Sequence, residues 1–126
     1  MINLTHTELF ADLTSINDNG EIIDLHNEYD CLGYRFENKT LSVNFIKIPS
    51  EGHACLLFKN STIIKHELLT DDLNEIKTLC TFYRGRFEEK GMVLEYSEDY
   101  GNYFYIEFEN GTLIELFSTD VNLLLI

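Results

Sequence analysis

The sequence lacks the short motifs that identify many enzymes and cofactor-binding proteins. No G-x-G-x-x-G or P-loop pattern surrounds any glycine, and no CxxC is present. His53 and Cys55 would share one face of a strand, but no second ligand pair accompanies them, so we predict no metal site. The cysteines, Cys31, Cys55 and Cys80, are odd in number and are expected to be buried, reduced thiols. We therefore expect a protein without catalytic residues, metal or cofactor, and not an enzyme.

Long apolar segments and targeting segments are also missing. No apolar run approaches the ~20 residues that a membrane-spanning helix needs. The first residues, Met1–His6, have neither the basic nor the apolar region of a signal peptide. These features predict a cytoplasmic protein that does not associate with membranes.

Basic residues are few. The chain has 9 Lys and Arg against 22 Asp and Glu, which gives a formal net charge of −13. Because 44% of its 126 residues are apolar, we expect residues 1–126 to form a single folded domain with an acidic surface. Such a surface repels nucleic acid and attracts cationic proteins, although acidity can also serve solubility alone. Nucleic-acid binding is therefore disfavoured, and a basic protein partner is favoured.

One phrase, Phe-(Glu/Lys)-Asn-x-Thr-(Leu/Ile), occurs three times in the chain. In each copy, Asn and the residue after it suit the two central positions of a type I′ hairpin turn. We therefore predict three β-hairpins in the same register. Their opposed pairs are Phe36 with Leu41, Phe58 with Ile63, and Phe108 with Leu113.

Period-two alternation or β-rich composition extends over most of the remaining chain, with Gly33 at the position of an expected bulge. The fold class predicted from this pattern is mainly β, an antiparallel sandwich or a strongly curved sheet of about nine short strands. The segments with strand character are Glu21–His26, Tyr29–Phe36, Leu41–Phe45, Ala54–Phe58, Thr62–Leu68, Thr81–Glu88, Met92–Tyr96, Asn102–Phe108, Thr112–Phe117 and Val121–Leu125.

Two segments have helical signals. Thr5 and Glu8 form a capping box, and the apolar residues after them have helical spacing, so a short N-terminal helix is predicted over about 6–16. The segment 70–80 also has helical spacing but lies between strands. Thr70 as N-cap, with acidic residues in the first turn, favours a short helix there over a strand.

The segment 96–105 is the first candidate for a binding surface. Its tyrosines alternate with Ser, Gly, Asn and acidic residues, a composition typical of protein-binding loops, and a cationic partner would meet both aromatic rings and carboxylates. The alternative is an ordinary hairpin loop whose tyrosines pack on the sheet. The predicted contact residues here are Tyr96, Glu98, Asp99, Tyr100 and Tyr103.

A second acidic patch is predicted on the expected helix near 70–80. It consists of Asp71, Asp72 and Glu75. The alternative interpretation is that Asp71 and Asp72 only stabilise the positive end of the helix dipole.

The predicted short N-terminal helix, the Asn-tipped hairpins, the run Ala54–Asn60 and the closing segment Phe104–Phe117 together resemble small β-rich bacterial immunity proteins of contact-dependent growth inhibition and other polymorphic toxin systems. The resemblance implies a cytoplasmic, non-enzymatic protein that binds one cognate toxin, often a nuclease, and covers its active site. A charge of −13 agrees with that role, because the cleft of a nuclease is basic. The alternative is a small-ligand-binding or adaptor β-sandwich unrelated to toxins. The oligomeric state stays open.

Overall fold

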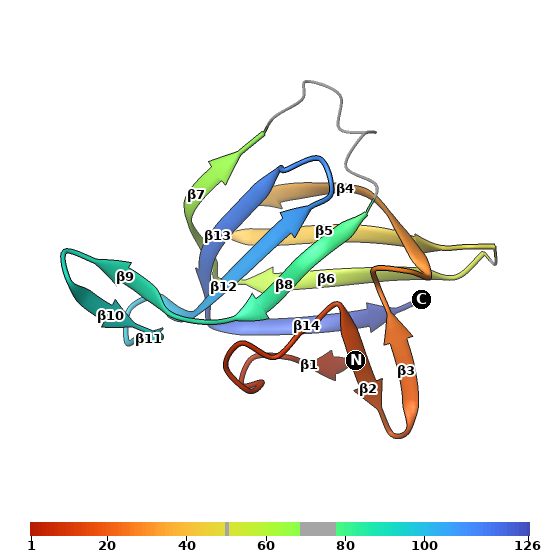
Figure 1. The fold of residues 1–126 in the computed structure, drawn as a ribbon, viewed down its shortest axis with the longest axis horizontal. Coiled ribbons are helices and arrows are strands. Elements are labelled where there is room, and N and C mark those ends of the chain that lie inside the picture. Colours follow the sequence, from red (N-terminus) through yellow and green to blue (C-terminus); the bar gives the residue numbers. More distant parts are fainter. Residues whose placement is uncertain (50, 69–77) are drawn as a thin grey trace.

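The computed structural model describes residues 1–49, 51–68 and 78–126. In these residues the regular secondary structure is β-strand throughout, which confirms a mainly β fold (Figure 1). The strands are β1 (Ile2–Asn3), β2 (Ser15–Asp18), β3 (Glu21–Asp24), β4 (Tyr29–Glu37), β5 (Thr40–Lys47), β6 (His53–Lys59), β7 (Thr62–Glu67), β8 (Leu79–Arg84), β9 (Phe87–Glu89), β10 (Met92–Leu94), β11 (Tyr96–Ser97), β12 (Gly101–Phe108), β13 (Leu113–Ser118) and β14 (Asp120–Leu125).

Ten of the strands form two antiparallel sheets that pack face to face. The first sheet has the order β1-β14-β6-β5-β4, and the second has the order β11-β12-β13-β7 with β8 also paired to β12. In Figure 1 the strands of the second sheet run obliquely across those of the first. Between them lies a core of apolar side chains from both sheets, in which the Phe58 ring lies 5.7 Å from Phe82 and 5.8 Å from Phe104 between centroids.

Two stretches of chain pass from one sheet to the other at the same corner. The chain leaves the first sheet after Lys59 and enters the second at Thr62, and it returns from the second to the first between Ser118 and Asp120. Asp120 pairs with Lys59 and Phe117 with Thr62, so the two crossings lie side by side. The Ser118 hydroxyl donates a 2.6 Å hydrogen bond to the Lys59 carbonyl and joins them.

The first Asn-tipped turn is the predicted type I′ hairpin. Asn38 and Lys39 both have positive φ, 52° and 58°, and Phe36 lies opposite Leu41. The second copy of the phrase does not form a hairpin, because β6 and β7 belong to different sheets. Phe58 therefore lies opposite Leu41 and Val121 rather than opposite Ile63.

The third turn is a hairpin with a different register. Its loop has three residues: the Gly111 N–H donates to the Phe108 carbonyl, and the Phe108 N–H donates to the Thr112 carbonyl. Gly111, at φ 89°, is the left-handed residue of a type I turn closed by a bulge. The extra loop residue places Leu113 opposite Glu107 instead of Phe108.

The helix predicted over 6–16 is absent, since turns and irregular chain occupy these residues up to the start of β2. The capping hydroxyl has another partner, because Thr5 Oγ1 accepts a 2.9 Å hydrogen bond from the Val121 N–H. The backbone N–H groups of Phe10 and Leu13 donate to carbonyls of β8, at 2.7 and 2.8 Å. Hydrogen bonds to two strands thus replace those of a helix.

Other expectations concern single positions. The register of β4 shifts at Gly33, as the predicted bulge requires. The segment predicted as one strand over Thr81–Glu88 is interrupted at Gly85 and divides between β8 and β9. The helix predicted near 70–80 falls mostly on residues 69–77, outside the described residues, but its last positions, Leu79 and Cys80, belong to β8.

The thiols only partly match the expectation. Cys31 and Cys55 are buried, whereas Cys80 is exposed. Burial raises the pKa of the Cys31 thiol to about 11, which keeps it protonated. Within the described ranges of the chain, no helix is long and apolar enough to cross a membrane.

Candidate partner-binding surface

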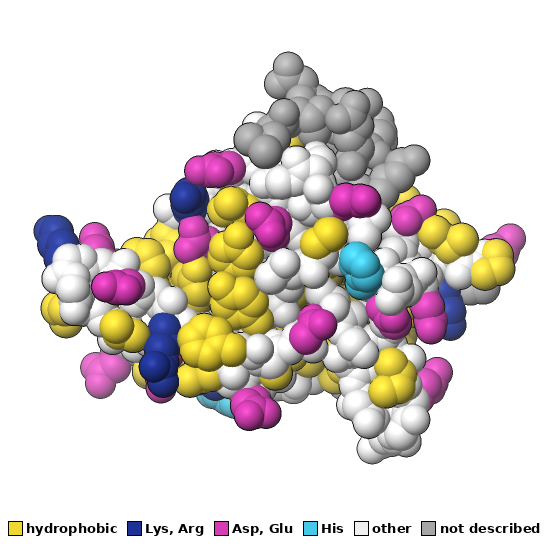
Figure 2. Space-filling model, viewed as in Figure 1, with side chains coloured by type: hydrophobic (Ala, Val, Ile, Leu, Met, Phe, Trp, Pro, Cys, Tyr) yellow, Lys and Arg dark blue, Asp and Glu magenta, His cyan; other side chains and the backbone are white. Residues whose placement is uncertain are grey.

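The outer face of the second sheet carries aromatic side chains where an antiparallel sheet open to water usually carries polar ones. Along β12, Phe104, Ile106 and Phe108 are buried in the core between the sheets, so the alternate positions, Tyr103 and Tyr105, lie on the outer face. We call six rings the aromatic face: Tyr83, Phe87, Tyr100, Tyr103, Tyr105 and Phe117. Figure 2, viewed as Figure 1, shows hydrophobic side chains gathered left of centre over β8, β12 and β13, with both acidic and basic side chains around them.

The rings of the aromatic face contact one another in two groups. Tyr83 stacks on Tyr105 with centroids 5.2 Å apart. Phe117 is the centre of the other group: its ring lies 5.8 Å from Phe87, 5.9 Å from Tyr103 and 6.2 Å from Tyr100. Tyr83, Tyr103, Tyr105 and Phe117 come from β8, β12 and β13, so the second sheet holds these four in fixed relative positions. Phe87 comes from β9, and Tyr100 from the turn before β12.

Two carboxylates lie among these rings. The Tyr103 hydroxyl donates a hydrogen bond to Glu115, and the Tyr105 hydroxyl donates one of 3.4 Å to Glu107. Burial, and then the neighbouring carboxylates, raise the pKa of both hydroxyls, that of Tyr105 to about 12. The tyrosines therefore stay protonated and neutral, and rings with negative charge beside them form a surface suited to cations.

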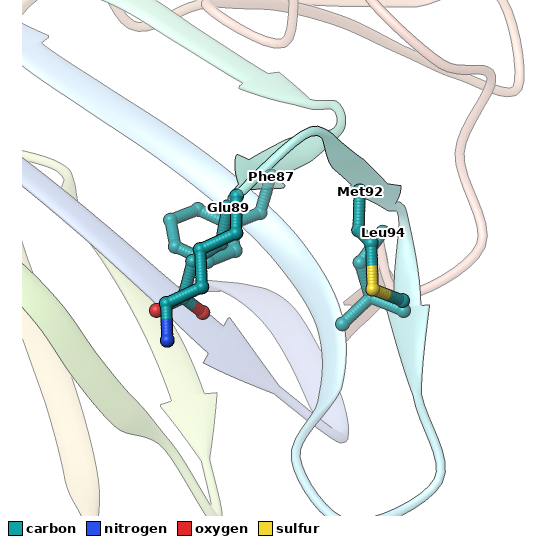
Figure 3. Close-up of a pocket in the computed structure, with 5 residues that line it drawn as sticks. Phe87, Glu89, Met92 and Leu94 are labelled. Atoms are coloured by element: carbon teal, nitrogen blue, oxygen red, sulfur yellow. The ribbon is translucent and has the colours of Figure 1, made fainter.

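A two-stranded arm, β9 and β10, projects from one end of the molecule (Figure 1). Its tip is a type I′ turn at Lys90 and Gly91, with φ 52° and 78°. Leu94 lies opposite Phe87 and Met92 opposite Glu89, so these four side chains share one face of the arm, as Figure 3 shows. Glu88 and Val93 are opposed on the other face. We call these two strands the arm.

A groove lies between the arm and the second sheet. Its volume is ≈ 410 Å³, and it is lined by Thr62, Ile64, Phe87, Glu89, Leu94, Ser97, Tyr100 and Phe117. A smaller hollow of ≈ 220 Å³ adjoins it along the arm, where Lys90 and Met92 join three of the same residues, Phe87, Glu89 and Leu94. Both are mostly apolar, and Glu89 is the carboxylate common to them.

Most of the contact residues predicted in the segment 96–105 lie on the surface beside this groove. Tyr96, Glu98, Asp99 and Tyr100 are exposed in β11 and the turn that follows it. The Ser97 hydroxyl accepts hydrogen bonds from the backbone N–H groups of Asp99 and Tyr100, at 3.3 Å each, and so shapes the turn. Of these predicted residues, Tyr100 lines the groove and contacts Phe117.

Tyr103 does not fit the predicted role of an exposed anchor. Only 4% of its surface is exposed, because Phe87 and Phe117 pack against its ring. It supports the aromatic face from beneath and holds Glu115 in place. The second predicted patch, Asp71, Asp72 and Glu75, lies outside the described residues.

The sequence prediction missed the residues that complete the surface: Tyr83, Phe87, Glu89, Leu94, Tyr105 and Phe117. One signal for part of it is the run Tyr103–Ile106, which is apolar or aromatic at every position and so places rings on both faces of a strand. Phe87 and Phe117 carry no such signal, because only the fold brings them together.

In the described part of the chain, no group of three or more His, Cys, Asp and Glu side chains is arranged to hold a metal ion. Comparisons of this chain with protein-family models, with curated proteins and with solved structures found no match. The aromatic face, the arm and the groove are therefore the observations from which a function can be argued.

Proposed function

We propose that this chain is a non-enzymatic, cytoplasmic immunity protein that binds a cognate toxin with a basic surface, such as a nuclease, and covers its active site. The observation that carries the proposal is the aromatic face with its carboxylates. Aromatic side chains are the residues that most often dominate the binding energy of protein interfaces. Here they occupy one sheet face, on which Tyr100 is exposed, and Tyr96 adds a further exposed ring at its edge.

Charge supports a cationic partner. The formal charge of −13 favours encounter with a basic protein, and Glu107, Glu115 and Glu89 place part of that charge at the aromatic face and the groove. Glu98 and Asp99 add exposed carboxylates at its edge. A nuclease cleft, which binds phosphates with Lys and Arg, is complementary to this arrangement.

The arm supports coverage of a cleft. It projects from the body, and the side chains of Met92 and Val93, on opposite faces, are 71% and 59% exposed. Apolar residues at the end of a narrow projection gain burial when they enter a concave site. We therefore place the arm and the groove at the centre of the proposed interface.

A second candidate is a small-ligand-binding domain, favoured by one observation, the groove. Its volume of ≈ 410 Å³ falls within the range of ligand sites, about 300–1,000 Å³. Its walls include exposed Tyr100 and Glu89, whereas such sites enclose most of their ligand. The open form of the groove fits a side chain of a protein better than an enclosed metabolite.

The decisive experiment co-expresses this chain with the toxic domain encoded immediately upstream of its gene and scores survival. We expect protection, and we expect Met92→Asp combined with Tyr100→Ala to abolish it. Lys47→Ala is the matched control, since Lys47 lies on β5 of the first sheet. Failure to protect, with both proteins folded and soluble, would favour the ligand-binding or adaptor function. Protection by the double variant would retain the function and reject this interface.

A further inference from the structure

The groove between the arm and the second sheet has the chemistry of a receptor for one particular side chain. We propose that it takes an arginine side chain of the partner protein, with the guanidinium group against the aromatic rings and paired with Glu89. This inference deepens the proposed function, on which it rests for the identity of the partner, and its own test needs no toxin.

The walls suit the flat guanidinium group and the apolar stem of arginine. Phe117 and Tyr100 lie with centroids 6.2 Å apart and planes inclined by 44°, and Phe87 meets Phe117 edge to face at 5.8 Å. Because Phe117 is only 3% exposed, the ring faces offered to a guanidinium group are those of Tyr100, which is 50% exposed, and of half-buried Phe87. A guanidinium group is attracted to such faces and can stack on them. Leu94 and Ile64 complete the lining with aliphatic surface for the methylene groups.

Within the described part of the chain, the charge that lines the groove is a single exposed carboxylate. Glu89 lies opposite Met92 on the face of the arm that carries Phe87 and Leu94, and in Figure 3 the labelled side chains lie together on that face. The neighbouring arginine of the chain, Arg86, is already engaged, with its Nε 3.2 Å from Glu95. Of the described residues, Lys90 lines only the smaller hollow, and the eight that line the groove include no cation. The Glu89 carboxylate is therefore available to an incoming cation.

Two other occupants fit less well. A lysine would bring a compact, strongly hydrated ammonium group that loses more hydration on an aromatic wall and cannot make the paired, planar contact of arginine with a carboxylate. A second copy of this chain would bring another charge of −13 to an acidic surface, so repulsion disfavours self-association through the groove.

The test uses the full chain and three small probes: the blocked amino acids N-acetyl-arginine amide, N-acetyl-lysine amide and N-acetyl-norleucine amide. Each is titrated into ¹⁵N-labelled protein while amide chemical shifts are recorded. We expect saturable shifts with the arginine probe, confined to the arm, the turn before β12 and the end of β13. Affinity for the lysine probe should be lower by about fivefold or more, an energy difference of roughly 1 kcal/mol.

Matched variants on the same arm identify the carboxylate. Glu89→Gln should weaken the arginine probe by about fivefold or more, because it removes the charged partner inside the groove. Glu88→Gln removes the same charge from the opposite face of the arm and should change the affinity less than twofold. Both residues are exposed, so neither change disturbs the core, and superimposable spectra of the free variants verify this.

The outcomes separate this inference from the proposed function. Absence of localised shifts, equal affinity for the lysine or norleucine probe, or equal effects of Glu88→Gln and Glu89→Gln would each overturn the arginine site. If the arginine probe binds as expected but no toxin is neutralised, the site stands and the immunity function is rejected. If the toxin is neutralised but the probe does not bind the groove, the immunity function stands and the arginine site is rejected.

Discussion

The hydroxyl of Tyr103 on β12 donates a hydrogen bond to the carboxylate of Glu115 on β13. The two residues are not directly opposed, because Tyr103 lies opposite Phe117 and Glu115 opposite Tyr105, so the bond runs diagonally across the ladder. This hydrogen bond holds the Glu115 carboxylate against the aromatic face and fixes the orientation of the Tyr103 and Glu115 side chains.

Removing this hydroxyl should destabilise the fold. Tyr103→Phe leaves Glu115 in aromatic surroundings without its donor, and hydrogen bonds to charged groups contribute about 1.5–3 kcal/mol. We expect a loss of about 1–2 kcal/mol in the free energy of unfolding, measured by urea denaturation. Tyr105→Phe is the control, since its bond to Glu107 is longer, at 3.4 Å, and should contribute less. Equal losses of stability in the two variants would show that the Tyr103–Glu115 hydrogen bond contributes no more than the Tyr105–Glu107 hydrogen bond.

Stability should fall in alkaline solution. Burial, and then the nearby carboxylates, raise the pKa of Tyr105 to about 12, above the ordinary value near 10 for an unfolded chain. The folded state therefore keeps a proton that the unfolded state releases, and this contribution, complete below about pH 10, is lost as pH rises through about 12. Urea midpoints at increasing pH should decline over this window, and less steeply in Tyr105→Phe. An unchanged slope in that variant would contradict the raised pKa.

Gly101, at the start of β12, should tolerate no side chain. Its φ is 91°, and an added Cβ would lie 2.4 Å from the Ser118 carbonyl oxygen, in the backbone at the corner. We expect Gly101→Ala to cost about 2–4 kcal/mol of stability. Gly91→Ala tests the cost of the positive φ alone, because Gly91 has φ 78° and no atom lies within 4 Å of an added Cβ. This variant should lose about 1 kcal/mol of stability. Stability is measured by thermal or urea unfolding. Similar losses in the two variants would mean that the backbone at Ser118 can shift to accommodate the added Cβ.

The first and second Asn-tipped turns should respond in opposite directions to glycine. Lys39 adopts φ 58° in a type I′ turn, where glycine is favoured, so Lys39→Gly should stabilise by about 0.5–1 kcal/mol. Ser61 donates its hydroxyl to the Phe58 carbonyl at 2.5 Å and is buried, so Ser61→Gly should destabilise by about 1–2 kcal/mol. An increase in the free energy of unfolding for both variants would contradict the assignment of Ser61 to a crossing between the sheets rather than to a hairpin turn.

Binding to a basic partner should depend on salt and on the edge of the aromatic face. The association rate should fall as ionic strength rises from about 0.01 M to 0.15 M, over which the screening length shrinks from about 30 Å to 8 Å. Glu98→Gln with Asp99→Asn should reduce the association rate, whereas Tyr100→Ala should raise the dissociation rate, both measured by surface plasmon resonance. Lys47→Ala serves as the control, since Lys47 lies on β5 of the first sheet. A salt-independent association rate would argue against a cationic partner.

The sequence predicts strand positions well because alternation is local. Strand β5 follows directly from it, whereas β12 follows from its β-rich composition and the turn at Asn38 from its turn residues. The pairing of those strands is not local. The phrase at 58–63 has the same pattern as the hairpin at 36–41, yet its two halves belong to different sheets because β14 pairs with β6 and β13 with β7. The N-terminal segment was misread for the same reason: its polar groups bond to strands distant in sequence.

The candidate surface was predicted in part. The loop around Tyr100 is a continuous segment with a recognisable composition, so the sequence alone indicates it as a candidate. The groove is built by Ile64, Phe87 and Phe117, which come from three separate strands and appear in the sequence as ordinary core residues. Composition therefore locates one wall of the groove, whereas the other walls depend on the topology of the second sheet.

The corner shared by Lys59 and Asp120 has a consequence for how the protein opens. Since the two chain crossings lie side by side there and the Ser118 hydroxyl joins them, we expect the ends of both ladders to open together at this corner. Amide hydrogen exchange in β6 and β13 should therefore report the same opening event, with similar protection. A partner that contacts only the second sheet would then also slow amide hydrogen exchange in the first sheet, although the core separates the partner from that sheet.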